Sequence, residues 1–128
     1  MVYLTAEQVL FIHARLISEI GGAHGLRDLG MLLSVVARPQ STFDGQDLYP
    51  DPFSKTAALL ESLVGNHEFN DGNKRTAITS AGLFLILNGY RLTADNKQLE
   101  TFTLQCAQRL VSLEQMVFWL KSNSAKNS

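Results

Sequence analysis

The sequence predicts an all-α protein, a single-domain bundle of about six helices arranged around a central apolar helix over residues 73–87. Three observations indicate this class. Apolar residues recur at helical spacing along most of the chain, and capping and stop residues delimit these segments. With 128 residues the chain can bury one core without disulfides or a metal. The run from residue 81 to 87 is apolar on all sides, which is typical of a helix inside a bundle.

The first helix is predicted from its cap. Thr5, followed three residues later by Gln8, can form a capping box, and Gly21-Gly22 ends the helix. His13 falls among the apolar positions of this helix. A hydrogen-bonded histidine at the edge of the core is therefore favoured over a catalytic one.

A second helix follows a glycine-rich turn. Asp28 can cap it, and Pro39 prevents it from continuing much beyond residue 37. We expect its inward face to consist of Leu29, Leu32, Leu33 and Val36. The turn-rich segment 39–51 suits a long exposed loop or a short hairpin, and such segments are often lids or binding elements.

Two further helices flank the most polar short stretch of the chain. Asp51-Pro52 predicts the start of a helix that runs to about residue 64. The central helix, from about residue 73 to 87, stops at Asn88-Gly89. Small residues near its start allow other helices to approach closely.

The last third of the chain predicts two more helices. A short extended link at 90–92 precedes a helix over about 95–109, and Ser112 can cap a final one. Cys106 is most simply a buried small hydrophobe. We assign residues 1–121 to the domain and expect residues 122–128 to form a polar tail that frays.

Composition excludes several classes of protein. A net charge of −1 argues against a protein that coats nucleic acid, so we expect no direct nucleic-acid binding. The longest nearly apolar run, 77–87, falls short of the roughly 20 residues of a membrane-spanning helix. The first residues lack the features of a secretory signal, and the single cysteine gives no sign of an oxidising compartment. We therefore expect a cytoplasmic protein without a membrane partner.

The chemistry is concentrated between the third and fourth helices. The turn Asp71-Gly72-Asn73 precedes a helix whose first N–H groups are unpaired, an arrangement that favours an anion. Glycine lets the backbone approach a ligand closely. Lys74 and Arg75 place two cations at the helix end where cations are disfavoured, and a polyphosphate would compensate them.

Two neighbouring side chains extend this interpretation. His67 could take a proton from a hydroxyl, and Asp71 would suit a magnesium ion bridging phosphates. Phe69 lies between them as a buried pin. The set predicts phosphoryl or nucleotidyl transfer. The alternative is a plain interhelical turn with a capping histidine and solvated cations, and the residues alone leave both interpretations open.

The stretch His67-x-Phe69-x-Asp71-Gly72-Asn73-Lys74-Arg75 resembles the signature of Fic/Doc proteins, HxF followed by D or E and then GNGRxxR. It is closest to the Doc branch, the death-on-curing toxins of toxin–antitoxin systems, which have NKR instead of NGR. The resemblance implies the Fic fold. It extends to the glycine-rich turn, the flexible segment at 39–51, which lies where the family has its target-docking flap, and the order of the helices.

Two positions depart from the commoner Fic pattern. Lys74 stands where that pattern has its second glycine, and Ile78 where it has its second arginine. The lysine occupies space that glycine leaves for a phosphate, and the isoleucine removes a bidentate phosphate clamp. Fic enzymes transfer AMP to a hydroxyl, whereas Doc-like members transfer the γ-phosphate of ATP. Both substitutions favour the Doc reaction.

The resemblance implies a role for each matching residue. His67 is expected to act as general base on a serine or threonine hydroxyl, and Asp71 to bind or organise Mg²⁺. The phosphates of ATP would be held by Gly72, Asn73, Lys74 and Arg75.

The resemblance also implies the partners. The target would be a translation factor, elongation factor Tu, whose phosphorylation arrests translation. An antitoxin, whose C-terminal segment folds into a groove on the toxin, would neutralise the protein. The inhibitory pattern [S/T]xxxE[G/N] of many Fic proteins does not occur in the sequence. Two alternatives remain: AMP transfer to a target hydroxyl, and a catalytically silent binding module.

Overall fold

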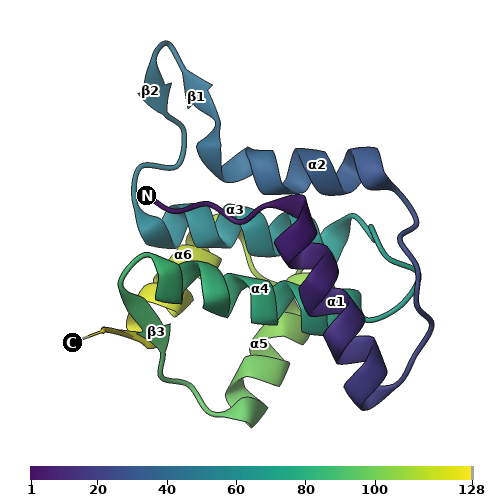
Figure 1. Ribbon diagram of the computed structural model, residues 1–128. Coiled ribbons are helices and arrows are strands. Elements are labelled where there is room, and N and C mark those ends of the chain that lie inside the picture. Colours follow the sequence, from purple (N-terminus) through teal and green to yellow (C-terminus); the bar gives the residue numbers. More distant parts are fainter. Residues whose placement is uncertain (128) are drawn as a thin grey trace.

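In the computed structural model, which describes residues 1–127, the helix Asn73–Leu87 (α4) crosses the middle of the molecule (Figure 1). The other helices of the described chain are α1 (Ala6–Ile20), α2 (Leu29–Ala37), α3 (Pro52–Gly65), α5 (Asn96–Ala107) and α6 (Leu113–Ser122). The predicted all-α bundle is confirmed. No helix within residues 1–127 is long and apolar enough to cross a membrane.

The strands are few and short. A hairpin of β1 (Thr42–Phe43) and β2 (Gln46–Asp47) follows a single 3-10 turn, Arg38–Gln40, and stands clear of the helices in Figure 1. A second pair joins β3 (Tyr90–Leu92) to β4 (Ser124–Lys126).

Residues of α4 explain its central position. It packs against α1, α3, α5 and β3. Ala77, Ser80 and Ala81 are buried near its start and let neighbouring helices approach, and Phe84 and Leu85 fill the core farther along. The helix is not enclosed throughout, because its last two residues, Ile86 and Leu87, are partly exposed.

The helix starts follow the predicted caps, except at the site. Capping boxes formed by Thr5, Asp51, Asp95 and Ser112 begin α1, α3, α5 and α6, and Asp28 caps α2. Helix α4 instead begins after Gly72, which has a left-handed conformation and offers no side-chain cap. Its first N–H groups are therefore left open at the motif.

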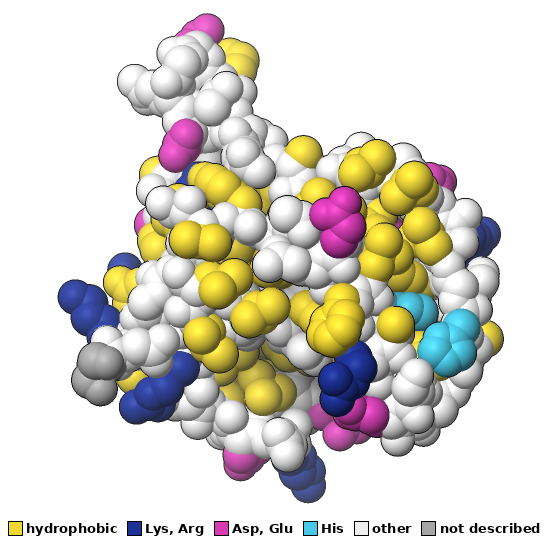
Figure 2. All heavy atoms as spheres, in the orientation of Figure 1, with side chains coloured by type: hydrophobic (Ala, Val, Ile, Leu, Met, Phe, Trp, Pro, Cys, Tyr) yellow, Lys and Arg dark blue, Asp and Glu magenta, His cyan; other side chains and the backbone are white. Residues whose placement is uncertain are grey.

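The predicted inward face of α2 is partly wrong. Leu32 and Val35 are buried, whereas Leu29 and Leu33 are 52% and 51% exposed. Nearly every residue of α2 is apolar, so periodicity could not specify which side faces the core. Figure 2 shows hydrophobic side chains along the outer side of this helix.

The segment after α2 forms the short hairpin that was one of the two predicted outcomes. Asp44 and Gly45 have positive φ angles of 51° and 77°, as a two-residue hairpin turn requires. A buried lysine holds its base: Lys55 Nζ donates to Pro39 O and to the Asp47 carboxylate, at 3.1 and 3.3 Å. The hairpin is thus a projecting element with a fixed base.

The polar C-terminal segment was predicted to fray, but most of it is held in place. Ser124–Lys126 pairs with Tyr90–Leu92, and Ser124 Oγ donates to Leu120 O at 2.6 Å. We expected fraying because the tail has few apolar side chains to bury in the core. Hydrogen bonding between backbones needs no apolar side chains, however. Of the predicted tail, Ser128 lies outside the described residues.

Candidate functional site

Two loops lie side by side at the start of α4. The loop before the helix carries the motif, and the turn after α1 pairs with it through Leu26 and Phe69. The N–H groups of Arg27 and Asp28 donate to Glu68 O at 2.7 and 3.1 Å. These main-chain bonds fix the motif loop on a second segment that is distant in the sequence.

Phe69 is the buried pin that was predicted for this loop. Its side chain is 2% exposed and stacks on the His13 ring, with centroids 3.8 Å apart and planes 7° from parallel. The side chain of Asn73 accepts from Phe69 N and donates to Phe69 O, at 3.1 and 2.9 Å. Both side chains therefore shape the loop.

Asp71 presents an exposed carboxylate that is held from two sides. Oδ2 accepts the N–H of Ala23 at 3.2 Å, and Oδ1 accepts the N–H of Gly72 at 2.8 Å. These hydrogen bonds lower the pKa of the Asp71 carboxyl, and the bond from Ala23 has the largest effect. Asp71 is therefore ionised at neutral pH and points in a defined direction.

His67 occupies the opposite end of the motif loop. It is exposed, it has a φ of 51°, and its ring makes no hydrogen bond to the described residues. An imidazole nitrogen is thus free to receive a proton, as the predicted role requires. A positive φ is unusual for a residue other than glycine and is often found at functional sites.

A pocket of about 460 Å³ joins these groups. Its lining includes five of the six predicted site residues, namely His67, Asp71, Gly72, Asn73 and Lys74. Leu104 and Ala107 of α5 and Gln108, which follows this helix, also line the pocket. The structure thus brings together five of the residues to which the sequence assigned proton transfer, metal binding and phosphate binding.

Arg75, the sixth predicted residue, faces a different hollow. Together with Lys74 it lines an apolar groove of about 790 Å³ between α1, α4 and α5. Ile78, which stands at the place of the second Fic arginine, lines this groove too. The position that the commoner Fic pattern uses for a cation is here part of an apolar surface.

The start of α4 can accommodate a phosphate. Thr76 is the first residue of the helix whose N–H bonds back, to Gly72 O at 3.0 Å, so the three preceding N–H groups have no helical partner. The side chain of Asn73 bonds to Phe69 and does not cap the helix. The main-chain N–H of Asn73 can therefore donate to a ligand. Lys74 adds an exposed cation beside these donors.

Asp71 fits a magnesium ion that arrives with a nucleotide. Within residues 1–127 no group of three or more His, Cys, Asp or Glu could hold a metal by itself. Magnesium usually takes one or two carboxylates and completes its shell with water and phosphate oxygens. Each Asp71 oxygen accepts one N–H and keeps a lone pair, so this carboxylate can contribute to such a shell.

The turn after α1 had no predicted role at the site. A Cβ on Gly22 would lie 2.7 Å from Asp71 Oδ2, and one on Gly25 would lie 2.7 Å from Asn70 Nδ2. Both glycines also have positive φ angles, of 118° and 127°. The closely spaced glycines were a visible signal, but their pairing with the motif is a long-range contact that no local pattern reports.

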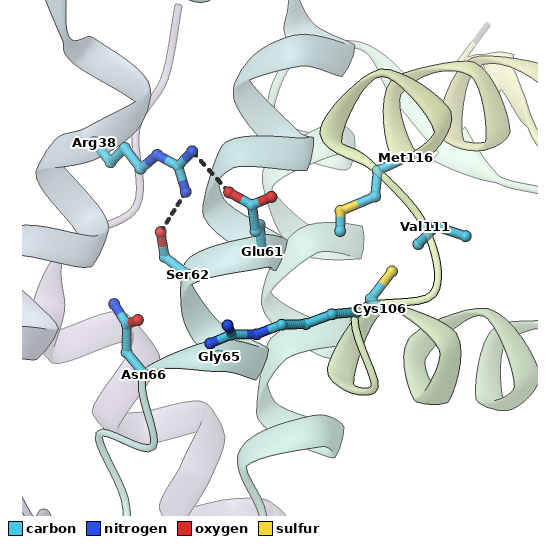
Figure 3. Close-up of a pocket in the computed structure, with 9 residues that line it drawn as sticks. Arg38, Glu61, Ser62, Gly65, Asn66, Cys106, Val111 and Met116 are labelled. Carbon is cyan, nitrogen blue, oxygen red and sulfur yellow. Dashed lines mark hydrogen bonds and ion pairs between the residues drawn. The ribbon is translucent and has the colours of Figure 1, made fainter.

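A separate hollow of about 360 Å³ is lined by residues of α3, among them Glu61 and Ser62, and by Arg38 (Figure 3). There Arg38 donates to Glu61 and Ser62 of α3, both at 2.8 Å, and to the Tyr49 hydroxyl beyond the hairpin, at 3.0 Å. Cys106 is 3% exposed, as predicted for a small packing residue, and burial raises the pKa of its thiol to about 12.

A helical bundle with this loop ahead of its central helix defines a Fic-type fold. The chain belongs to the Fic/Doc family: the model described as "Fic/DOC family" matches residues 3–85. It is 48% identical over 93 residues to "Toxin Doc" of Mycolicibacterium smegmatis, covering 73% of this chain and 69% of that protein. It is 31% identical over 121 residues to "Protein kinase doc" of Escherichia phage P1, covering 94% of each chain. The predicted likeness to the Doc branch is confirmed.

Proposed function

We propose that this protein is a Doc-like toxin that uses ATP and Mg²⁺ to phosphorylate a serine or threonine hydroxyl of a translation factor. Elongation factor Tu is the target that the family resemblance implies. The observation that carries the proposal is one pocket whose lining includes His67, the open start of α4 and Lys74. The relatives named as a toxin and as a protein kinase support it.

Each residue then has one task. His67 accepts the proton of the target hydroxyl as that oxygen attacks the γ-phosphorus of ATP, and ADP leaves. The first N–H groups of α4 and Lys74 bind phosphate oxygens, which stabilises the developing charge. Asp71 would hold the magnesium ion, and the bound ion would neutralise part of the phosphate charge.

Transfer of AMP is the second candidate. The commoner Fic pattern has a glycine where this chain has Lys74, and that glycine leaves space for a close-lying phosphate. In this chain Lys74 extends from the start of α4, and Ile78 faces the apolar groove in place of a phosphate-binding arginine. Both features support transfer of the γ-phosphate.

The partner that would neutralise the protein is an antitoxin, and the groove between α1, α4 and α5 is the surface we assign to its C-terminal segment. Apolar side chains dominate the lining, among them Leu16, Ile20, Ile78, Leu83, Ile86 and Leu99. Lys74 and Arg75 lie at one end. An amphipathic helix with acidic residues at that end fits both the apolar floor and the charge. Apolar side chains also gather over α4 in Figure 2. Both partners would meet the protein in the cytoplasm.

Labelled ATP separates the two reactions. Purified protein is incubated with Mg²⁺, elongation factor Tu and ATP labelled at either the α- or the γ-phosphorus. We expect label on the target from the γ position alone, and none with His67→Ala. His24→Ala, at an exposed histidine outside the pocket, is the matched control and should retain transfer. Label from the α position alone would establish AMP transfer instead.

Growth arrest tests the third possibility, a binding module without catalysis. Induced expression of the wild type should stop growth, and expression of His67→Ala at the same level should not. If the two proteins arrest growth equally, chemistry at this pocket is not the cause.

A further inference from the structure

His13 lies outside the predicted site but contacts one of its residues directly. Its Nε2 is 2.7 Å from the main-chain oxygen of Asp71. A carbonyl oxygen only accepts hydrogen bonds, so the ring carries its proton on Nε2 and donates it. The side chain is 4% exposed, which gives this bond little competition from water.

The orientation of this donor is fixed. The imidazole stacks on Phe69, and Phe69 is itself held by the side chain of Asn73. His13 shares the buried face of α1 with Val9 and Ile17, one turn away on either side. A rigid helix therefore presents the Nε2–H to the motif loop at a defined point.

The contact controls more than one atom of Asp71. The oxygen that accepts from His13 belongs to the same planar peptide as the Gly72 N–H, and this N–H donates to Asp71 Oδ1. Fixing the oxygen fixes the peptide plane and hence the direction of that N–H. The Ala23 N–H holds the other carboxylate oxygen. His13 and the turn after α1 thus hold Asp71 from both ends.

We propose that His13 is a positioning residue, which through the Asp71–Gly72 peptide sets how the Asp71 carboxylate faces the nucleotide-bound Mg²⁺ and how α4 begins. The inference rests on the proposed function, because it assumes that Asp71 serves a metal–nucleotide complex. It assigns to a core histidine a role in ligand affinity in addition to its role in packing.

Binding of the metal–nucleotide complex distinguishes this role from packing alone. Titration calorimetry follows Mg²⁺ with a non-hydrolysable ATP analogue, and thermal unfolding is recorded for the same samples. His13→Phe keeps an aromatic ring on Phe69 but has no donor. We expect it to bind the complex about tenfold more weakly, as is usual when a residue that orients a metal ligand is lost.

Two further variants define the cause. The amide nitrogen of glutamine can take the place of Nε2, so His13→Gln should recover most of the lost affinity. Val9→Ala, at a fully buried residue on the same face of α1, should lower thermal stability without changing binding. In the unmodified protein, the Nε2–H signal of His13 should be protected from exchange and should shift when the complex binds.

The outcomes separate this inference from the proposed function. If the wild type binds and His13→Phe binds equally well, the positioning role is wrong, while the proposed function stands. If the Nε2–H signal does not respond to binding, the positioning role is contradicted even where His13→Phe fails to fold. If the wild type binds no metal–nucleotide complex, both proposals fall.

Discussion

Replacing Glu68 by glutamine should stabilise the protein at pH 8 and change it little at pH 5. The Glu68 side chain is fully buried, and its carboxylate oxygens have no hydrogen-bond partner among the described residues. Burial disfavours the charged form and raises the pKa of this carboxyl to about 7. Glutamine has a similar shape and no charge to bury.

The sign and size follow from proton binding. Between the ordinary pKa of 4.5 and the raised value of about 7, the folded protein retains a proton that the unfolded chain has released. Stability is therefore highest below this window and is lost as the pH rises through about 7. Each pKa unit corresponds to about 1.4 kcal/mol, which limits the loss to about 3 kcal/mol. Glu68→Gln should therefore gain about 2 to 3 kcal/mol more at pH 8 than at pH 5.

Urea unfolding measures this difference. Both proteins should carry His67→Ala, which we expect to allow production without toxicity, and circular dichroism should be recorded at pH 5 and pH 8. At pH 8 the urea concentration at the unfolding midpoint should be higher for the Glu68→Gln protein than for its parent. The dependence of the free energy of unfolding on urea should not change. Glu100→Gln, at an exposed carboxylate of α5, is the control and should change both midpoints little. An equal effect of Glu68→Gln at pH 5 and pH 8 would show that the Glu68 carboxyl does not have a raised pKa in the folded protein.

Three further predictions concern the site and the groove. Lys74→Ala should raise the KM for ATP without lowering the melting temperature, since a cation at a helix start is unfavourable without a ligand; an unchanged KM with a lower melting temperature would contradict this. Gly22→Ala should reduce phosphate transfer because its Cβ would lie 2.7 Å from Asp71 Oδ2. Gly21→Ala is the control: its φ of 101° strains the backbone, but its Cβ would have no other atom within 4 Å, so it should lower stability alone. Ile86→Asp, at a 54% exposed residue of the groove, should weaken antitoxin binding at least tenfold in calorimetry; Phe118→Asp, at a residue outside the groove, should not, and equal binding by both would exclude the groove.

Local rules predicted most of the helices because each start has a chemical cause that is visible in a few residues. Thr5 with Gln8 and Asp51 with Pro52 satisfy open N–H groups from within their own turns. The bounds of α4 were also predicted correctly, from Asn73 to the stop at Asn88. These signals act over one helical turn, so a sequence displays them directly.

Contacts between distant segments could not be predicted in this way. The inner side of α2 depends on how it meets α3, and Leu29 and Leu33 are apolar whether or not they are covered. The pairing of β4 with β3 joins residues more than thirty positions apart. Backbone hydrogen bonds of this kind do not depend on side-chain type, so no sequence pattern predicts them.

The site shows the same division. The grouping of His67, Asp71 and Lys74 around one pocket follows from their closeness in sequence, and it was predicted. The bond from His13 to Asp71 and the approach of Gly22 to Asp71 join residues that are 58 and 49 positions apart in the sequence. The direction of Arg75 toward the groove depends on the packing of α4 against α1 and α5.

The intact mass of elongation factor Tu shows whether this protein transfers a phosphate group to it. Purified factor is incubated with ATP, Mg²⁺ and this protein, and then measured by mass spectrometry. We expect the addition of one phosphate group at a serine or threonine, which His67→Ala should abolish and His24→Ala should leave unchanged. Addition of an adenylate, or an unmodified factor in a reaction that still arrests translation, would contradict it.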